Sequence, residues 1–126
     1  MGEARAEQTI EKPADEIWKI LGSFGEMSWM PGVESCELNG DDRTLKMNGM
    51  EIVERQLRRD DSGRSLTYGI VGGVPVGHHQ ATITVTPKGD ATSLVTWDVD
   101  TDDAMVDAMK GIYQSSLDSL KQQLEG

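Results

Sequence analysis

Residues 102–124 read DDAMVDAMKGIYQSSLDSLKQQL, and this stretch decides the fold. Apolar or small side chains recur along it at three- and four-residue steps, namely Met105, Met109, Ile112, Ser116, Leu117, Leu120 and Leu124. This spacing predicts one amphipathic helix of about 22 residues, roughly 33 Å long at about 1.5 Å per residue. A helix of this length matches a strongly curved sheet that wraps around it.

Strand signals fill most of the sequence that precedes this helix. Period-two alternation bounded by turn residues predicts strands at residues 3–11, 33–38, 43–47, 50–59, 64–71, 78–86 and 92–100. Asn48-Gly49 joins two of these segments and is the strongest two-residue hairpin signal. The spacing favours an antiparallel meander, so we expect a curved sheet of about seven strands.

Two short helices are expected between the first and second strands. Pro13 suits the first turn of a helix and Gly22 suits its end, with an apolar stripe between them at Ile17, Trp18 and Leu21. A second helical turn is expected over residues 25–30. Together these elements predict one α+β domain over residues 1–126, a length that is typical of single domains.

The charge of the chain excludes several classes of partner. The 12 basic and 22 acidic side chains sum to a net charge of −10, and no basic cluster offsets it, so we expect no nucleic-acid partner. No apolar run is long enough to predict a membrane span. The N-terminal residues do not resemble a secretory signal and Cys36 is the only cysteine, so we expect a cytoplasmic protein with a reduced thiol.

Metal and cofactor sites are not predicted. His78 and His79 are adjacent on a strand and therefore point to opposite faces, which leaves too few ligands for zinc. The glycine-rich segment 72–77 matches no phosphate-binding motif and is better interpreted as a lip or a long turn. We expect no cofactor.

Seven short motifs occur in an order that resembles a known fold. They are Lys12-Pro13-Ala14-Asp15-Glu16-Ile17-Trp18, Trp29-Met30-Pro31-Gly32-Val33-Glu34-Ser35-Cys36, Glu54-Arg55-Gln56-Leu57 with Asp60-Asp61, Tyr68-Gly69-Ile70-Val71-Gly72-Gly73, Ala81-Thr82-Ile83-Thr84-Val85-Thr86-Pro87, Val95-Thr96-Trp97, and Tyr113 with Leu117 and Leu120. The set resembles the helix-grip fold of the START and Bet v 1 superfamily, and within it the bacterial polyketide cyclase/dehydrase and lipid-transport family. The resemblance implies an internal apolar cavity between the concave face of the sheet and the long helix.

The resemblance, combined with strand alternation, predicts which residues line that cavity. The expected ligand-binding residues are mostly apolar, with a few polar groups among them. They are Glu34, Met47, Ile52, Glu54, Tyr68, Ile70, His79, Ala81, Trp97, Met105, Met109, Ile112 and Ser116. Because Glu34 and Glu54 are both expected to face inward, the cavity is predicted to be acidic and to prefer neutral or cationic apolar ligands.

Three of these residues are candidates for chemistry, and each has a plainer alternative. Glu54 would be desolvated and could act as an acid or base, or it could be solvated or held by an arginine. His79 could bind a ligand oxygen or act as a base, or it could lie in solvent at the end of a loop. Tyr68 could orient an oxygenated ligand, or it could simply pack in the core.

The sequence supports three hypotheses about function. The first is binding or transport of a small hydrophobic, oxygen-bearing molecule, lipid-like or polyketide-like. The second is a polyketide cyclase or dehydratase in which Glu54 or His79 abstracts a proton and Tyr68 stabilises the enolate. The third is an interaction module with a filled core, which a cavity smaller than about 300 Å³ would favour. The ligand and the oligomeric state are left open.

Overall fold

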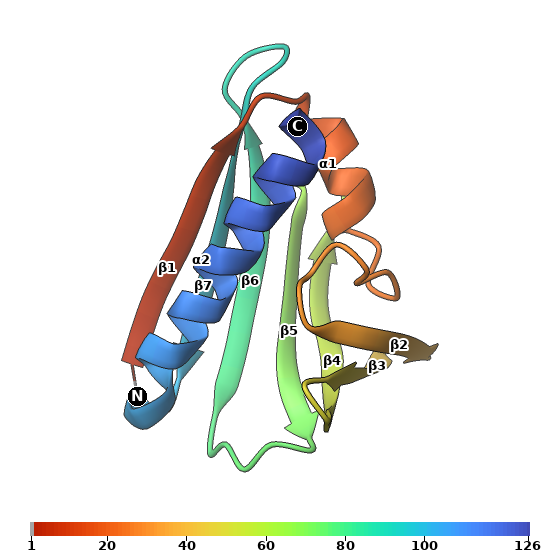
Figure 1. The fold of residues 1–126 in the computed structure, drawn as a ribbon, viewed down its shortest axis with the longest axis vertical. Helices are drawn as coiled ribbons and strands as arrows, with labels where there is room; N and C mark the ends of the chain where they lie inside the picture. The colour runs from red at the N-terminus through yellow and green to blue at the C-terminus, as the bar shows by residue number, and fades with distance from the viewer. Residues whose placement is uncertain (1) are drawn as a thin grey trace.

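A computed structural model describes residues 2–126 and confirms the predicted fold class (Figure 1). Seven antiparallel strands form one sheet in the order β1-β7-β6-β5-β4-β3-β2. The strands are β1 (Gly2–Ile10), β2 (Val33–Asn39), β3 (Asp42–Met47), β4 (Met50–Asp60), β5 (Ser65–Gly72), β6 (His79–Pro87) and β7 (Ser93–Thr101). The helices are α1 (Ala14–Leu21) and α2 (Asp103–Glu125).

The hairpin between β3 and β4 follows from its sequence. Asn48 and Gly49 both have positive φ angles, 51° and 81°, which a type I′ turn requires and which this residue pair adopts readily. Met47 and Met50 pair directly across the turn. The hairpin therefore carries two methionines next to an exposed asparagine at its tip.

The connection between β1 and β2 contains one helix and a series of turns. In α1, Gly22 occupies the C-cap position, as expected, and Pro13 occupies the N-cap position, one residue before the first turn. The segment predicted as a second helix forms successive turns instead, with Met30 N–H donating to the carbonyl oxygen of Met27 at 3.1 Å. Gly25 lies within this segment and Pro31 follows it, and both residues disfavour a continuous helix here.

Helix α2 lies across one half of the concave face of the sheet (Figure 1). It packs against β1 and β7, whereas β2 and β3 project away from it on the other side of the molecule. Its C-terminal half contributes Leu117 and Leu120, which are fully buried in the core. Its N-terminal half faces the strands that curve away, and the space between them is the cavity described below.

Candidate functional site

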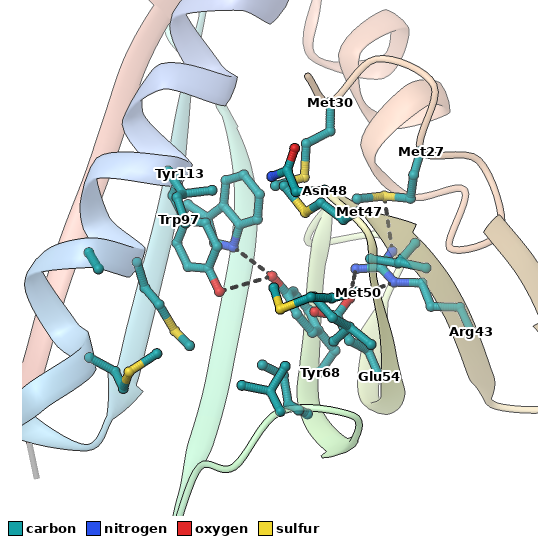
Figure 2. A pocket seen from close by; sticks show the side chains of 18 residues that line it. Met27, Met30, Arg43, Met47, Asn48, Met50, Glu54, Tyr68, Trp97 and Tyr113 are labelled. Atoms are coloured by element: carbon teal, nitrogen blue, oxygen red, sulfur yellow. Dashed lines mark hydrogen bonds and ion pairs between the residues drawn. The ribbon is translucent and has the colours of Figure 1, made fainter. Parts of the chain in front are cut away.

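A cavity of about 160 Å³ lies between the N-terminal half of α2 and strands β3, β4, β5 and β7 (Figure 2). Its lining is mostly apolar and includes every methionine of the chain after Met1. The lining residues are Met27, Met30, Arg43, Leu45, Met47, Asn48, Met50, Ile52, Glu54, Tyr68, Ile70, Val74, Trp97, Met105, Ala108, Met109, Ile112 and Tyr113. The exposed side chains of Met50 and Ile112 flank its opening, between the β3–β4 hairpin and α2.

One wall of the cavity holds a buried ion pair. Arg43 and Glu54 are direct cross-strand partners on β3 and β4. Arg43 Nε and Nη2 both contact Oε1 of Glu54, at 2.8 and 2.7 Å, while Nη1 donates to the carbonyl oxygen of Phe24 at 3.1 Å. The guanidinium also lies over the ring of Phe24, 4.0 Å from its centroid. These contacts fix the arginine, so its charge stays beside the carboxylate.

Burial and the ion pair act in opposite directions on the pKa of Glu54. Desolvation raises the pKa of the Glu54 carboxyl, and the adjacent Arg43 guanidinium opposes that rise. Among the described residues, Oε2 has no hydrogen-bond partner, because both arginine contacts go to Oε1. The expectation of an acidic cavity is therefore wrong: its one carboxylate is paired with one guanidinium.

A network of neutral aromatic groups adjoins the ion pair, since the ring centroid of Tyr68 lies 4.9 Å from the guanidinium carbon of Arg43. Trp97 Nε1–H donates to the hydroxyl oxygen of Tyr68 at 3.1 Å, and the two tyrosine hydroxyls lie 3.5 Å apart (Figure 2). His79 Nε2 lies 2.9 Å from the hydroxyl oxygen of Tyr113. The Trp97 and Tyr113 rings stack with an angle of 4° and centroids 3.9 Å apart, which holds both polar groups in place.

The state of His79 follows from its surroundings. The backbone N–H of Ile70 donates to Nδ1 of His79 at 3.2 Å, so Nδ1 carries no proton and the neutral ring carries its proton on Nε2. Burial lowers the pKa of His79 to about 4, with a smaller contribution from His78. His79 is therefore a neutral hydrogen-bond donor to Tyr113 at physiological pH.

Nine of the thirteen predicted ligand-binding residues line the cavity. They are Met47, Ile52, Glu54, Tyr68, Ile70, Trp97, Met105, Met109 and Ile112. They come from five elements, β3, β4, β5, β7 and α2. Strand alternation and helix spacing, with the inward parity that the resemblance implies, therefore agree with half of the eighteen lining residues.

The other four predicted residues lie outside the lining. Glu34 is exposed at a β-bulge between Val33 and Ser35, where one extra residue breaks the alternation on which the prediction rested. His79 is buried behind Tyr113. Ala81 is buried, but its one-carbon side chain does not reach the cavity. Ser116 is also buried, and its hydroxyl donates to the carbonyl oxygen of Ile112 in its own helix at 2.7 Å.

Several lining residues were absent from the predicted set. The polar ones are Arg43, Asn48 and Tyr113, and Arg43 and Tyr113 carried a usable signal. Arg43 has the same strand parity as Leu45 and Met47, and Tyr113 follows Met109 by one helical turn. Met27 and Met30 come from the turns before β2, and Val74 from the β5–β6 loop, where no periodicity could predict their direction.

Within residues 2–126, no group of His, Cys, Asp or Glu side chains is arranged to hold a metal ion. The same residues include no helix of sufficient length and hydropathy to cross a membrane. The site is thus an apolar cavity with an ion pair on one wall and hydroxyl groups on another.

Comparisons with known proteins agree with this architecture. The family model described as polyketide cyclase / dehydrase and lipid transport matches residues 1–125. No match was found among curated proteins.

Solved structures include close matches in fold. The protein XoxI from Bacillus cereus is 28% identical, with a TM-score of 0.92 over 98% of this chain and 96% of that one. A START superfamily protein from Mycobacterium smegmatis has a TM-score of 0.79 at 13% identity, over 98% and 97% of the two chains. Norcoclaurine synthase from Thalictrum flavum has a TM-score of 0.70 at 18% identity, over 97% and 85%. The chain belongs to the polyketide cyclase/dehydrase and lipid-transport family, with a START and Bet v 1-like fold.

Proposed function

We propose that this protein binds a small hydrophobic, oxygen-bearing molecule in the cavity between α2 and the sheet. The observation that carries the proposal is the composition of the lining: methionine, aliphatic and aromatic side chains surround a few fixed polar groups. Apolar walls supply affinity by removing ligand surface from water, and the polar groups orient the ligand. The family's description, which includes lipid transport, is consistent with this class of ligand.

The size of the cavity limits the occupant. A volume of about 160 Å³ is below the range of ordinary ligand pockets, and by volume alone it favours the interaction module. An apolar cavity of about 150 Å³ is nevertheless large enough for benzene. The opening flanked by Met50 and Ile112 also supports entry of a ligand rather than a filled core. Because methionine side chains are flexible, six of them give walls that adapt to a larger ligand.

The same geometry favours binding over proton abstraction. Both ring nitrogens of His79 are engaged, and its pKa of about 4 makes it a weak base. Glu54 Oε1 is held by two contacts from Arg43, which oppose the rise in the pKa of this carboxyl that burial causes. Of the two candidate bases, His79 is therefore fully engaged, and Glu54 keeps only Oε2 outside the ion pair.

A thermal-shift titration with single-ring aromatic probes and short-chain fatty alcohols tests the proposal. Ligand bound only by the folded state stabilises it, by about 2.7 kcal/mol at a concentration 100 times the dissociation constant. We expect a concentration-dependent rise in Tm for at least one of these two chemical classes. Absence of a shift throughout both classes at saturating solubility would overturn the proposal.

A matched pair of variants locates the binding. Ala108 is exposed and lines the opening, whereas Ala104 is exposed one turn earlier on the same helix and does not line the cavity. Ala108→Trp should abolish the shift by blocking the opening, and Ala104→Trp should retain it. Equal shifts in the two variants would place binding elsewhere.

A further inference from the structure

The hydroxyl groups of Tyr68 and Tyr113 carry one more proton than their network can use. Four donors take part: Trp97 Nε1–H, His79 Nε2–H and the two hydroxyls. Three contacts connect them. The Trp97 and His79 protons occupy one contact each, and the contact between the hydroxyls uses one of their two protons. One hydroxyl proton has no acceptor in the network.

The protonation states make this count firm. Burial raises the pKa of both the Tyr68 and the Tyr113 hydroxyl, so both keep their protons at neutral pH. Nδ1 of His79 accepts a hydrogen bond from the backbone N–H of Ile70, so the proton of the neutral ring is on Nε2 and this nitrogen cannot accept a hydrogen bond from Tyr113. The surplus donor therefore belongs to the tyrosine pair.

The contact between the hydroxyls is also long. At 3.5 Å it exceeds the usual range of about 2.5–3.0 Å for O–H···O bonds, so it holds its proton weakly. Both tyrosines line the cavity, and their hydroxyl oxygens face each other at its wall (Figure 2). An acceptor atom placed between them could receive a hydrogen bond from each.

The neighbouring N–H groups strengthen these donors. Trp97 donates to one hydroxyl oxygen and His79 to the other, and a hydroxyl that accepts a hydrogen bond becomes a better donor. The stacking of Trp97 on Tyr113 and the burial of all four side chains fix the arrangement before a ligand arrives.

We propose that Tyr68 and Tyr113 form a two-donor site for a single carbonyl oxygen, so that the cavity selects compact aromatic ketones over hydrocarbons of the same shape. This inference rests on the proposed function, because it names the ligand class of the same cavity. A neutral carbonyl fits better than a carboxylate, because the chain carries a net charge of −10 and the one guanidinium that lines the cavity is already paired with Glu54. The cavity volume of about 160 Å³ suits one ring with a short substituent.

Acetophenone and α-methylstyrene test the site as a matched pair, because they differ only in an oxygen replaced by a methylene group. Calorimetric titration of the intact protein should show acetophenone binding about tenfold more tightly, as expected for one or two net hydrogen bonds. Equal affinity would overturn the two-donor site while leaving the cavity as an apolar ligand site. Binding of neither probe would overturn the proposed function as well.

A spectroscopic measurement tests the contact directly and needs no variant. The chain has only two tyrosines, so protein labelled at the hydroxyl-bearing ring carbon of tyrosine gives two NMR signals. Acetophenone should shift both signals in the direction of stronger hydrogen-bond donation, and α-methylstyrene should not. Shifts that are the same for both probes would contradict the proposal.

Single variants complete the test. Tyr68→Phe and Tyr113→Phe each leave one tyrosine hydroxyl, so each should reduce the tenfold preference to a few-fold while α-methylstyrene binding persists. Thr67→Val is the matched control, because Thr67 neighbours Tyr68 on β5 and its hydroxyl pairs with that of Thr82, outside the cavity lining. It should keep the full preference. A full preference in both tyrosine variants would exclude the hydroxyls as its source.

Discussion

The two halves of α2 face cores of different kinds. The C-terminal half packs Leu117 and Leu120 into a filled core together with Ile10, Val85 and Val95. The N-terminal half, with Met105 and Met109, faces methionines and aromatic rings around a cavity of about 160 Å³. Branched aliphatic side chains interdigitate in few conformations, whereas methionine adapts to irregular space. The C-terminal half of the helix therefore stabilises the fold, whereas the N-terminal half forms part of the cavity wall.

The largest expected effect on stability comes from the buried charges on the cavity side of the molecule. We call this side, made of the N-terminal half of α2 and the strands that face it, the hollow half. Glu54→Gln leaves the Arg43 guanidinium buried without its carboxylate, and breaking such a pair lowers the free energy of unfolding by about 3–5 kcal/mol. The neighbouring cross-strand pair is a matched control. Here the acidic residue, Asp42, is on β3 and the basic one, Arg55, is on β4, and both lie on the exposed face of the sheet. Asp42→Asn should therefore destabilise the protein far less.

Urea unfolding of the two variants measures this difference. Comparable losses for Glu54→Gln and Asp42→Asn would mean that the cavity wall behaves like solvent-exposed surface. In that case the hollow half could not be described as a preorganised site.

Truncation of α2 compares the filled and hollow halves directly. Leu117→Ala removes a fully buried side chain and should lower the free energy of unfolding by about 3–4 kcal/mol. Met109→Ala should lower it by only about 2 kcal/mol, because part of that side chain already borders empty space. Met109→Ala should also admit larger probes in the thermal-shift assay. Equal losses, with no change in the size of bound probes, would contradict the distinction between the halves.

A pH titration gives the smallest expected effect and reports on the aromatic wall. His79 has a pKa of about 4 in the folded protein against 6.5 as its ordinary value. The unfolded chain therefore binds more protons between these values, so stability is full above pH 6.5 and falls as the pH drops towards 4. Between about pH 7 and pH 5 we expect a loss of about 1–2 kcal/mol from this residue.

His79→Gln should remove this part of the pH dependence, and His78→Gln should keep most of it, since His78 is half-exposed and makes no contact with Tyr113. The comparison isolates His79 from the carboxylates that titrate in the same range. An NMR titration of the His79 ring with an ordinary pKa would overturn the assignment of a neutral, buried donor.

Much of the site could be predicted because periodicity determines the direction of a side chain within a regular element. Met47 and Ile52 on strands and Met105 and Met109 on the helix were located in this way. Glu34 was not, because a β-bulge shifts the alternation without a clear sequence signal. Met27 and Val74 lie in turns and loops, which have no period to extrapolate.

Other features depended on partners distant in sequence. The parity of β3 could have placed Arg43 on the cavity wall, but nothing local indicated that it would pair with Glu54 and cancel the expected negative charge. His79 was correctly assigned to the inner face of β6. Its contact with Tyr113, on a helix 34 residues further along the chain, made it a buried donor behind the wall instead of a cavity group.

The sequence by itself determined the elements, the hairpin at Asn48-Gly49, the long amphipathic helix and the faces of most strands, because these depend on local backbone preference and short-range periodicity. Only the tertiary structure decided the volume of the cavity, the pairing of Arg43 with Glu54 and the surplus hydroxyl proton of the tyrosine pair. Those properties arise where segments distant in sequence meet, so they depend on distances and partners that no single segment encodes.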